Sequence, residues 1–249
     1  MTKKNAAIIT GSSKGIGAEI ARKLSKAGYP VVINYLNSKD KAEAVLKEIE
    51  KNGGNGFIYQ ADVTQADQVE KMVLKTLETF GNIEVLVNNA GKNIINKNFQ
   101  NLEWVDFKSH LDVLLKGAFN TCKYVIPIME KLGKGKIINI TSIYTDGVPP
   151  VKTYDYISAK SALASFTRSL AVEYGVKGIT INNVSPGMTE TTMLGNLPEK
   201  TILVTEAQTP LRRLGNVEDV ANVVLALVSG AGDYITGETI RVSGGQKMI

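Results

Sequence analysis

The sequence predicts an α/β fold: a single domain, residues 1–249, with a doubly wound parallel sheet of about seven strands and helices on both faces. Two observations carry this prediction. Short apolar runs alternate with longer helical patterns along the whole chain, which is the pattern of repeated strand–helix units. Right-handed crossovers between such units give a doubly wound sheet. Glycines also stand where helices should end, shortly before the next strand, at Gly28, Gly81, Gly133 and Gly178.

The individual elements follow from this alternation. Strands are expected at residues 6–10, 31–35, 57–61, 84–88, 136–141, 179–184 and 239–242, and helices at 16–27, 39–51, 66–80, 102–131, 155–174 and 217–229. The segment from 187 to 210 matches no strand and only weakly a helix. A long irregular segment in a compact domain usually covers a ligand site. We therefore expect a substrate lid near residues 187–210.

Composition excludes several classes of function. The chain has 249 residues, 43% of them hydrophobic, which is enough to bury a sizeable core. Its net charge of +5 is too weak and too scattered to indicate nucleic-acid binding, and an anionic cofactor or substrate explains it as well. One cysteine, Cys122, excludes an internal disulfide framework and fits a reducing compartment. No stretch reaches membrane-spanning length, so we expect a cytoplasmic protein with no membrane or nucleic-acid partner.

A glycine-rich loop follows the first expected strand and opens the first helix. It reads Thr-Gly-Ser-Ser-Lys-Gly-Ile-Gly over residues 10–17. Glycine lets the backbone turn sharply and approach a pyrophosphate held at the helix N-terminus, although the spacing differs from the common G-x-G-x-x-G fingerprint. The alternative is that these glycines only allow tight packing of helix on strand. The residues expected to contact a dinucleotide are Gly11, Ser13, Lys14, Gly15, Ile16 and Gly17.

The end of the second expected strand favours NADP over NAD. An NAD site usually places an acidic side chain there for the ribose hydroxyls, and residues 33–38, Ile-Asn-Tyr-Leu-Asn-Ser, contain none. Lys14 in the glycine loop lies beside the place expected for a 2′-phosphate. No acidic side chain would repel a 2′-phosphate there, and the Lys14 cation is available to bind it. These two observations predict NADP(H), although no arginine stands near Asn37.

Three further motifs complete a family resemblance: Asn-Asn-Ala-Gly at residues 88–91, Ser142 after the fifth expected strand, and Tyr-Ile-Ser-Ala-Lys at 156–160. With the glycine loop, and in this order, they resemble the short-chain dehydrogenase/reductase family over essentially the whole chain, which implies a Rossmann-type sheet. Residues 210–215 and 234–245 are similar to the β-ketoacyl-(acyl-carrier-protein) reductases, although enzymes acting on sugars, steroids and quinones share that ending. This resemblance implies NADPH-dependent reduction of a 3-oxoacyl thioester in fatty acid synthesis.

The expected catalytic residues are Tyr156, Lys160 and Ser142. Tyr156 and Lys160 are four residues apart, so they share one face of a helix. The lysine cation should lower the pKa of the tyrosine, ordinarily about 10, and suit it to acid/base work. Ser142 can hydrogen-bond the substrate carbonyl oxygen. Seen alone, such a Tyr/Lys pair is normally a solvated helix face; the other motifs favour catalysis, and the resemblance implies the same three roles.

The resemblance also assigns cofactor contacts outside the glycine loop. It implies that Asp62 contacts the adenine ring, unless Asp62 or Thr64 instead caps the helix that follows. It implies further that the 88–91 motif lines the cofactor and that a segment beginning at 186 holds the nicotinamide carboxamide. The expected contacts are Asp62, Val63, Asn88, Ala90, Gly91, Tyr156, Lys160, Pro186, Gly187, Thr189 and Thr191.

One position departs from the family. The family carries a catalytic asparagine in a stretch like D-V-N-L-x-G, and residues 112–117 read Asp-Val-Leu-Leu-Lys-Gly, with Leu114 at that place. In the family this asparagine helps keep a water that links the lysine to solvent. Leucine cannot hydrogen-bond, so we expect the proton relay to be weakened or routed differently. Leu114 leaves a weakly active NADP-binding protein as one alternative to a thioester reductase. Another carbonyl reductase or alcohol dehydrogenase is the second, because such enzymes share the chain's C-terminal motif.

Other features concern partners. His110, the only histidine, matches no catalytic position and is expected at the surface or in helix packing, with no cluster for a metal. The two long helices carry apolar residues on more than one face, which predicts a homotetramer. The family resemblance implies a second interface near residues 237–249. The apolar residues of these two helices, expected at 102–131 and 155–174, include Val125, Ile128, Leu163, Phe166 and Leu170. Four lysines are expected near the cleft mouth, either docking an acidic carrier protein or forming a solvated face: Lys131, Lys134, Lys136 and Lys177.

Overall fold

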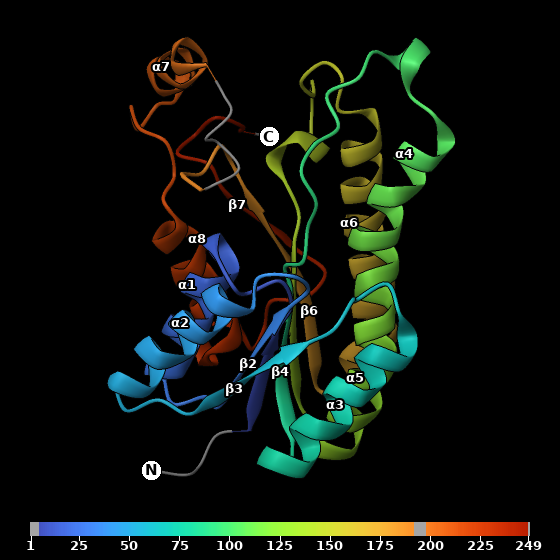
Figure 1. Cartoon of the computed structure of the whole chain (residues 1–249), viewed down its shortest axis with the longest axis vertical. Helices are drawn as coiled ribbons and strands as arrows, with labels where there is room; N and C mark the ends of the chain where they lie inside the picture. The colour runs from blue at the N-terminus through green and yellow to red at the C-terminus, as the bar shows by residue number, and fades with distance from the viewer. Residues whose placement is uncertain (1–4, 192–197, 249) are drawn as a thin grey trace.

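Parallel strands form a sheet at the centre of the molecule (Figure 1). The computed structural model describes residues 5–191 and 198–248, and within them the sheet has seven strands in the order β3-β2-β1-β4-β5-β6-β7. Each predicted strand is confirmed with bounds that differ by no more than two residues. The strands are β1 (Ala6–Ile9), β2 (Val31–Tyr35), β3 (Gly56–Gln60), β4 (Ile83–Asn88), β5 (Gly135–Ile140), β6 (Ile179–Pro186) and β7 (Thr239–Val242).

Helices cover both faces of this sheet, as the alternating pattern predicts (Figure 1). On one face lie α1 (Gly15–Lys26), α2 (Lys39–Lys51) and α8 (Val217–Val228); on the other lie α3 (Ala66–Phe80), α5 (Gly117–Leu132) and α6 (Tyr154–Tyr174). Each face has its own apolar core, since buried side chains of α1 and α8 pack on one side and those of α3 and α5 on the other. The doubly wound architecture is therefore confirmed.

The helical prediction for residues 102–131 needs one correction. The chain forms α4 (Trp104–His110), a π-helical segment (Leu111–Lys116) and then α5, which ends at Gly133 in the left-handed conformation with φ of 70°. An inserted wide turn has no periodicity signature, so the sequence pattern reads as one continuous helix. Such turns are frequent at functional sites, and this one contains Leu114.

The segment 187–210 is more regular than its sequence indicates. It contains α7 (Glu199–Gln208), a helix with no buried residue, so no apolar stripe marks it in the sequence. Residues 188–190 are joined to Gly215 by backbone hydrogen bonds. Residues 192–197 of the predicted lid lie outside the described part of the chain. Within the described residues, no helix is long and apolar enough to cross a membrane.

The four lysines expected near the cleft lie at the opposite edge of the sheet, so that prediction is wrong. Lys136 stands at the start of β5, whereas Ser142 follows its end. Three of these lysines form ion pairs: Lys134 Nζ lies 2.9 Å from Glu84 Oε2, Lys136 Nζ lies 2.7 Å from Asp233 Oδ1, and Lys177 Nζ lies 4.0 Å from Glu130 Oε1.

The strand order reverses between β1 and β4, which neighbour each other at the centre of the sheet. In doubly wound sheets ligands bind outside the carboxyl ends of the strands at this reversal. The predicted motifs follow the carboxyl ends of β1, β4 and β5. The fold therefore gathers them at one edge.

Candidate active site

The loop between β1 and α1 is held in shape by two asparagines. Asn34 in β2 accepts a hydrogen bond from the Gly11 amide at its Oδ1, 3.0 Å away. Asn89, after β4, donates its side-chain amide to the carbonyls of Thr10 and Gly11 at 2.9 and 3.0 Å. The Thr10 hydroxyl in turn accepts from the backbone amides of Asn89 and Ala90. These bonds fix the ends of two neighbouring strands to each other.

Two glycines of this loop have no room for a side chain. Gly11 has a φ of 61°, and a Cβ there would lie 2.8 Å from Ala90 Cα. A Cβ on Gly17 would collide with the Asn89 side-chain amide and would lie 2.9 Å from the Gly11 carbonyl oxygen. The first turn of α1 therefore presents bare backbone to the cleft. Free amide groups at a helix N-terminus attract the negative charge of a phosphate.

Lys14 is exposed at the N-cap position of α1, and its side chain has no ion pair or hydrogen bond within the described residues. Its cation is therefore available to an anionic ligand on the glycine loop. Beyond the end of β2 stand Leu36, Asn37 and Ser38, and none of them carries a negative charge. The arrangement is what a phosphate-bearing ribose requires. Thr191 lies on the other side of the loop, 3.8 Å from where a Cβ on Gly15 would stand.

Asp62, which follows β3, does not cap the next helix. Its Oδ1 accepts a hydrogen bond from the Thr64 amide at 2.9 Å, and its own amide donates to Gln68 at 2.8 Å. α3 begins later, with Gln65 at its N-cap position and no side-chain cap. Asp62 therefore shapes the loop after β3 and borders a cavity of about 480 Å³ between the ends of β2 and β3. The structure therefore supports neither Asp62 nor Thr64 as the cap of α3.

The side chain of Asn88 is used inside the protein. Its Oδ1 accepts from the Thr121 hydroxyl at 2.6 Å, and its amide donates to Asn139 Oδ1 at 2.8 Å. Asn139 donates onward to the Thr167 hydroxyl on α6 at 2.7 Å. This buried chain connects β4, β5 and α6. Because both ends of the Asn88 amide are committed, that residue contributes to the site by positioning the backbone that follows it.

Segment 186–191 is anchored in the same way. The Gly187 amide donates to the Val242 carbonyl at 2.9 Å, and the Thr189 hydroxyl donates to the Gly187 carbonyl at 3.0 Å. A Cβ on Gly187 would lie 2.8 Å from Gln246 Oε1. Thr189 is 7% exposed, so its side chain mainly holds the turn that leads out of β6.

The three predicted catalytic residues meet at the carboxyl end of β5. Ser142 follows this strand, and its Oγ accepts a hydrogen bond from the Tyr144 amide at 3.3 Å. Tyr156 and Lys160 lie one turn apart in α6, and Lys160 Nζ stands 5.8 Å from the centre of the Tyr156 ring. Lys160 is buried and donates to the Ile140 carbonyl at 2.5 Å. The three residues of the predicted catalytic motif therefore lie close together in the folded chain.

Electrostatics in this cluster differ from the sequence expectation. Burial raises the pKa of Tyr156, while a hydrogen bond with Ser142 acts in the opposite direction. Burial also lowers the pKa of Lys160 from 10.5 to about 8, because a charged amine is costly away from water. We expected Lys160 to lower the pKa of Tyr156; in the structure desolvation sets the direction, and the opposing influence comes from Ser142. Tyr156 therefore keeps its proton at neutral pH and is suited to donate it.

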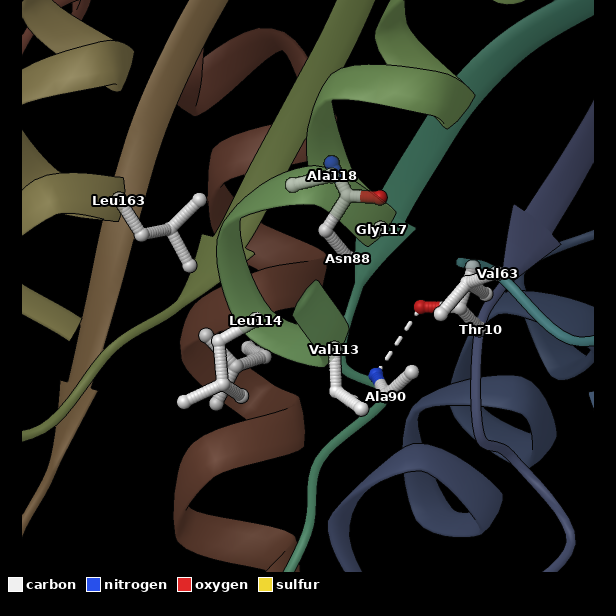
Figure 2. A pocket seen from close by; sticks show the side chains of 10 residues that line it. Thr10, Val63, Asn88, Ala90, Val113, Leu114, Gly117, Ala118 and Leu163 are labelled. Atoms are coloured by element: carbon white, nitrogen blue, oxygen red, sulfur yellow. Dashed lines mark hydrogen bonds between the residues drawn. The ribbon is translucent and has the colours of Figure 1, made fainter. Parts of the chain in front are cut away.

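Leu114 fills the place of the missing asparagine. It is 3% exposed and lines a cavity of about 10 Å³ together with Ala90 and Leu163. Figure 2 shows Leu114 on the π-helical turn beside Leu163, with Ala90 and Thr10 across the cavity. That volume is at the lower limit for one water molecule, and the leucine offers it no hydrogen bond. The side chain at position 114 therefore offers no polar group to a relay water.

Sequence reasoning missed several residues that organise the site. Thr10, Asn34 and Asn89 fix the glycine loop. A signal existed for Asn34 alone, because a buried strand rarely contains an asparagine. His110 is completely buried and lies against Asp155, with its Nδ1 2.8 Å from Asp155 Oδ2. It is thus a helix-packing residue, one of the two places expected for it, but with a charged partner that the sequence did not reveal.

Comparisons with known proteins agree with this geometry. A family model described as enoyl-(acyl carrier protein) reductase matches residues 11–247. The 3-oxoacyl-(acyl-carrier-protein) reductase FabG of Staphylococcus epidermidis is 40% identical over 244 residues, which cover 97% of this chain and 98% of the relative. The 3-oxoacyl-(acyl-carrier-protein) reductase of Synechocystis sp. is 39% identical over 246 residues, covering 98% and 97% of the two chains.

Solved structures give the same picture. A gluconate 5-dehydrogenase from Burkholderia cenocepacia, crystallised in complex with NADP and tartrate, superposes with a TM-score of 0.91 at 31% identity, covering 98% of this chain and 95% of the other. A dehydrogenase/reductase from Sinorhizobium meliloti superposes with a TM-score of 0.93, at the same identity and coverage. Similarity therefore extends over the whole chain in sequence and in fold.

Proposed function

This chain belongs to the short-chain dehydrogenase/reductase family, and on that premise we propose that it is an NADPH-dependent oxidoreductase that reduces the ketone of a 3-oxoacyl thioester in fatty acid synthesis. The substrate would be carried on acyl carrier protein. The observation that carries the proposal is the cluster of Tyr156, Ser142 and Lys160 at the carboxyl end of β5. Relatives named for this reaction, at about 40% identity over nearly their full length, support the substrate class.

Each residue of the cluster has a defined task. Ser142 donates a hydrogen bond to the ketone oxygen and stabilises the negative charge that develops on it. Tyr156 gives its proton to that oxygen, so that the ketone becomes an alcohol. A tyrosine whose pKa burial keeps high is protonated at neutral pH, which suits reduction. The Lys160 ammonium stabilises the phenolate that remains.

The residues of the glycine loop fit the pyrophosphate of a dinucleotide. Gly11 and Gly17 allow the loop to pack tightly against Ala90 and Asn89, where a Cβ would collide, and the N-terminus of α1 follows directly. Lys14 supplies an uncommitted cation, and the absence of an acid beyond β2 favours a 2′-phosphate. The chemistry that NADPH supplies when bound is a hydride for the carbonyl carbon. The expected contacts at Asp62, Val63 and the 88–91 and 186–191 segments remain part of this proposal.

Two alternatives rest on specific observations. Similarity to a gluconate 5-dehydrogenase supports a different carbonyl or alcohol substrate. Leu114 supports a weakly active NADP-binding protein, because it removes the relay asparagine. A panel of acetoacetyl thioesters, crotonyl thioester, sugars and quinones, each assayed with NADPH and NADH, separates these possibilities. We expect the acetoacetyl thioesters with NADPH to give the highest kcat/KM; a preference for a sugar or quinone would reassign the substrate, and turnover of none would favour the binding protein.

We also propose that the protein is a cytoplasmic homotetramer whose lid spans residues 187–210. Two of the apolar residues that suggested assembly, Val125 and Leu163, are buried in the chain's own core and carry no weight. Others support the proposal: Phe119 is 49% exposed on α5, and Val172 is 84% exposed on α6. Exposed apolar side chains on adjacent helices favour a partner subunit. Light scattering should give four times the chain mass, and a monomer mass would end this proposal.

A further inference from the structure

A buried polar pair joins α4 to α6 beside the catalytic tyrosine. His110 is the last residue of α4, and Asp155 lies in the first turn of α6. The His110 Nδ1 and the Asp155 Oδ2 are 2.8 Å apart, and both side chains are at most 1% exposed. Burying a carboxylate costs several kcal/mol unless a partner compensates for it. The pair therefore needs a reason beyond packing.

The hydrogen-bonding capacity of this pair is largely unused. Within the described residues, neither ring nitrogen of His110 and neither oxygen of Asp155 has a well-aligned hydrogen-bond partner. Unsatisfied buried polar groups are rare in native proteins and usually mark a functional or strained place. At a separation of 2.8 Å the nitrogen and the oxygen attract only if a proton lies on one of them. Their contact thus joins the two helices through one polar pair.

His110 contacts the catalytic residue as well. Its ring meets the ring of Tyr156 edge to face, with the centres 6.0 Å apart and the planes at 84°. Tyr156 directly follows Asp155, so one histidine contacts two successive residues of α6. The start of α6 has no other side-chain cap, because the Thr153 hydroxyl donates backwards to the Pro150 carbonyl at 2.6 Å. His110 therefore supports this turn from the side, beside Phe99, whose ring packs against Tyr154 with the centres 5.4 Å apart.

We propose that His110 is a positioning residue for carbonyl reduction: through Asp155 and the ring of Tyr156, it fixes the first turn of α6 so that the Tyr156 hydroxyl stays at Ser142. The proposal rests on the function proposed above. It assigns a task to a pair that the catalytic cluster does not use. Leu114 follows four residues later, in the π-helical segment that continues from α4. The end of α4 thus supports the tyrosine mechanically, whereas the next turn offers no polar side chain at position 114.

The test compares four variants by kcat, NADPH Kd and the NMR signal of the ¹³C-labelled Tyr156 Cζ, which is assigned by its loss in Tyr156→Phe. His110→Phe keeps a ring against Tyr156 but removes the link to Asp155. We expect kcat to fall about tenfold to a hundredfold, as misplacement of a reacting group does, with NADPH Kd unchanged and the Tyr156 signal shifted or broadened. Asp155→Asn keeps an acceptor for the histidine and should retain both the rate and the signal.

A double variant guards against misfolding. In His110→Phe/Asp155→Leu neither polar group is left buried without its partner, and replacing both partners by apolar residues can be nearly neutral for stability. We expect it to fold and to show the same loss of kcat. Lys108→Ala, which removes an exposed ion pair with Asp112 on the same helix, is the matched control and should behave as the parent. Parent-like kcat and an unmoved Tyr156 signal in either His110 variant would overturn the proposal. Because the signal is read without substrate, it still decides the matter if the parent reduces no thioester.

Discussion

Replacing Lys160 by methionine should make the protein more stable while it removes most of the activity. Lys160 is buried, and its pKa falls from 10.5 to about 8. That difference means that the charged amine costs the folded state roughly 3 kcal/mol relative to the unfolded chain. Methionine loses the hydrogen bond to the Ile140 carbonyl, worth about 1 kcal/mol. Lys160→Met should therefore raise the free energy of unfolding by about 2 kcal/mol near pH 6.5.

This gain should depend on pH in a defined direction. The cost of the charged lysine is fully present below pH 8, where the amine is protonated in both the folded and the unfolded chain. Between pH 8 and 10.5 the folded protein releases the proton first, so the stability of the parent rises with pH. Urea unfolding of parent and variant at pH 6.5 and 9.5 measures the gap, which should narrow at the higher pH. A variant less stable than the parent at pH 6.5, or a gap that does not change with pH, would refute this reasoning.

Three further substitutions test other parts of the account. Leu114→Asn restores an amide at the relay position and should raise kcat with little change in NADPH affinity. If the new amide finds no partner, its burial lowers the free energy of unfolding by about 1–3 kcal/mol. An equally stable variant with unchanged kcat would show that the proton takes another route. Gly17→Ala should weaken NADPH binding by about tenfold or more, or 1.4 kcal/mol, because the new Cβ displaces the Asn89 side-chain amide. The control Gly175→Ala, whose Cβ would have nothing within 4 Å, should bind NADPH as the parent does. Lys14→Ala should reduce the preference for NADPH over NADH measured by fluorescence titration at constant salt; equal affinities for the two cofactors in the parent would contradict the assignment of NADP.

Much of the fold could be predicted because its signals are local. Each central strand is a short apolar run bounded by polar or glycine residues, and glycines such as Gly133 end helices in a conformation that other residues avoid. The cluster of Ser142, Tyr156 and Lys160 was predictable because motif order maps directly onto strand order in a doubly wound sheet. What could not be predicted depends on contacts between distant segments.

The errors share this cause. The pairing of His110 with Asp155 joins residues 45 positions apart in sequence, and nothing near either residue signals it. The π-helical turn at 111–116 adds a residue to a turn without changing the apolar pattern. Lysines expected at the cleft lie at the opposite edge because α5 ends where β5 begins, at the amino end of the sheet. The raised pKa of Tyr156 depends on burial, which only the assembled fold determines.

The central claim is that Tyr156 is the proton donor of a carbonyl reductase, and one measurement tests it most directly. NADPH oxidation is followed with an acetoacetyl thioester for the parent and for Tyr156→Phe, with the Kd for NADPH measured on both proteins. The account predicts that kcat falls by about a hundredfold to ten-thousandfold, the range of a lost general acid, while the Kd for NADPH stays within about twofold, or 0.4 kcal/mol. A Tyr156→Phe protein that reduces the thioester at close to the rate of the parent would contradict it.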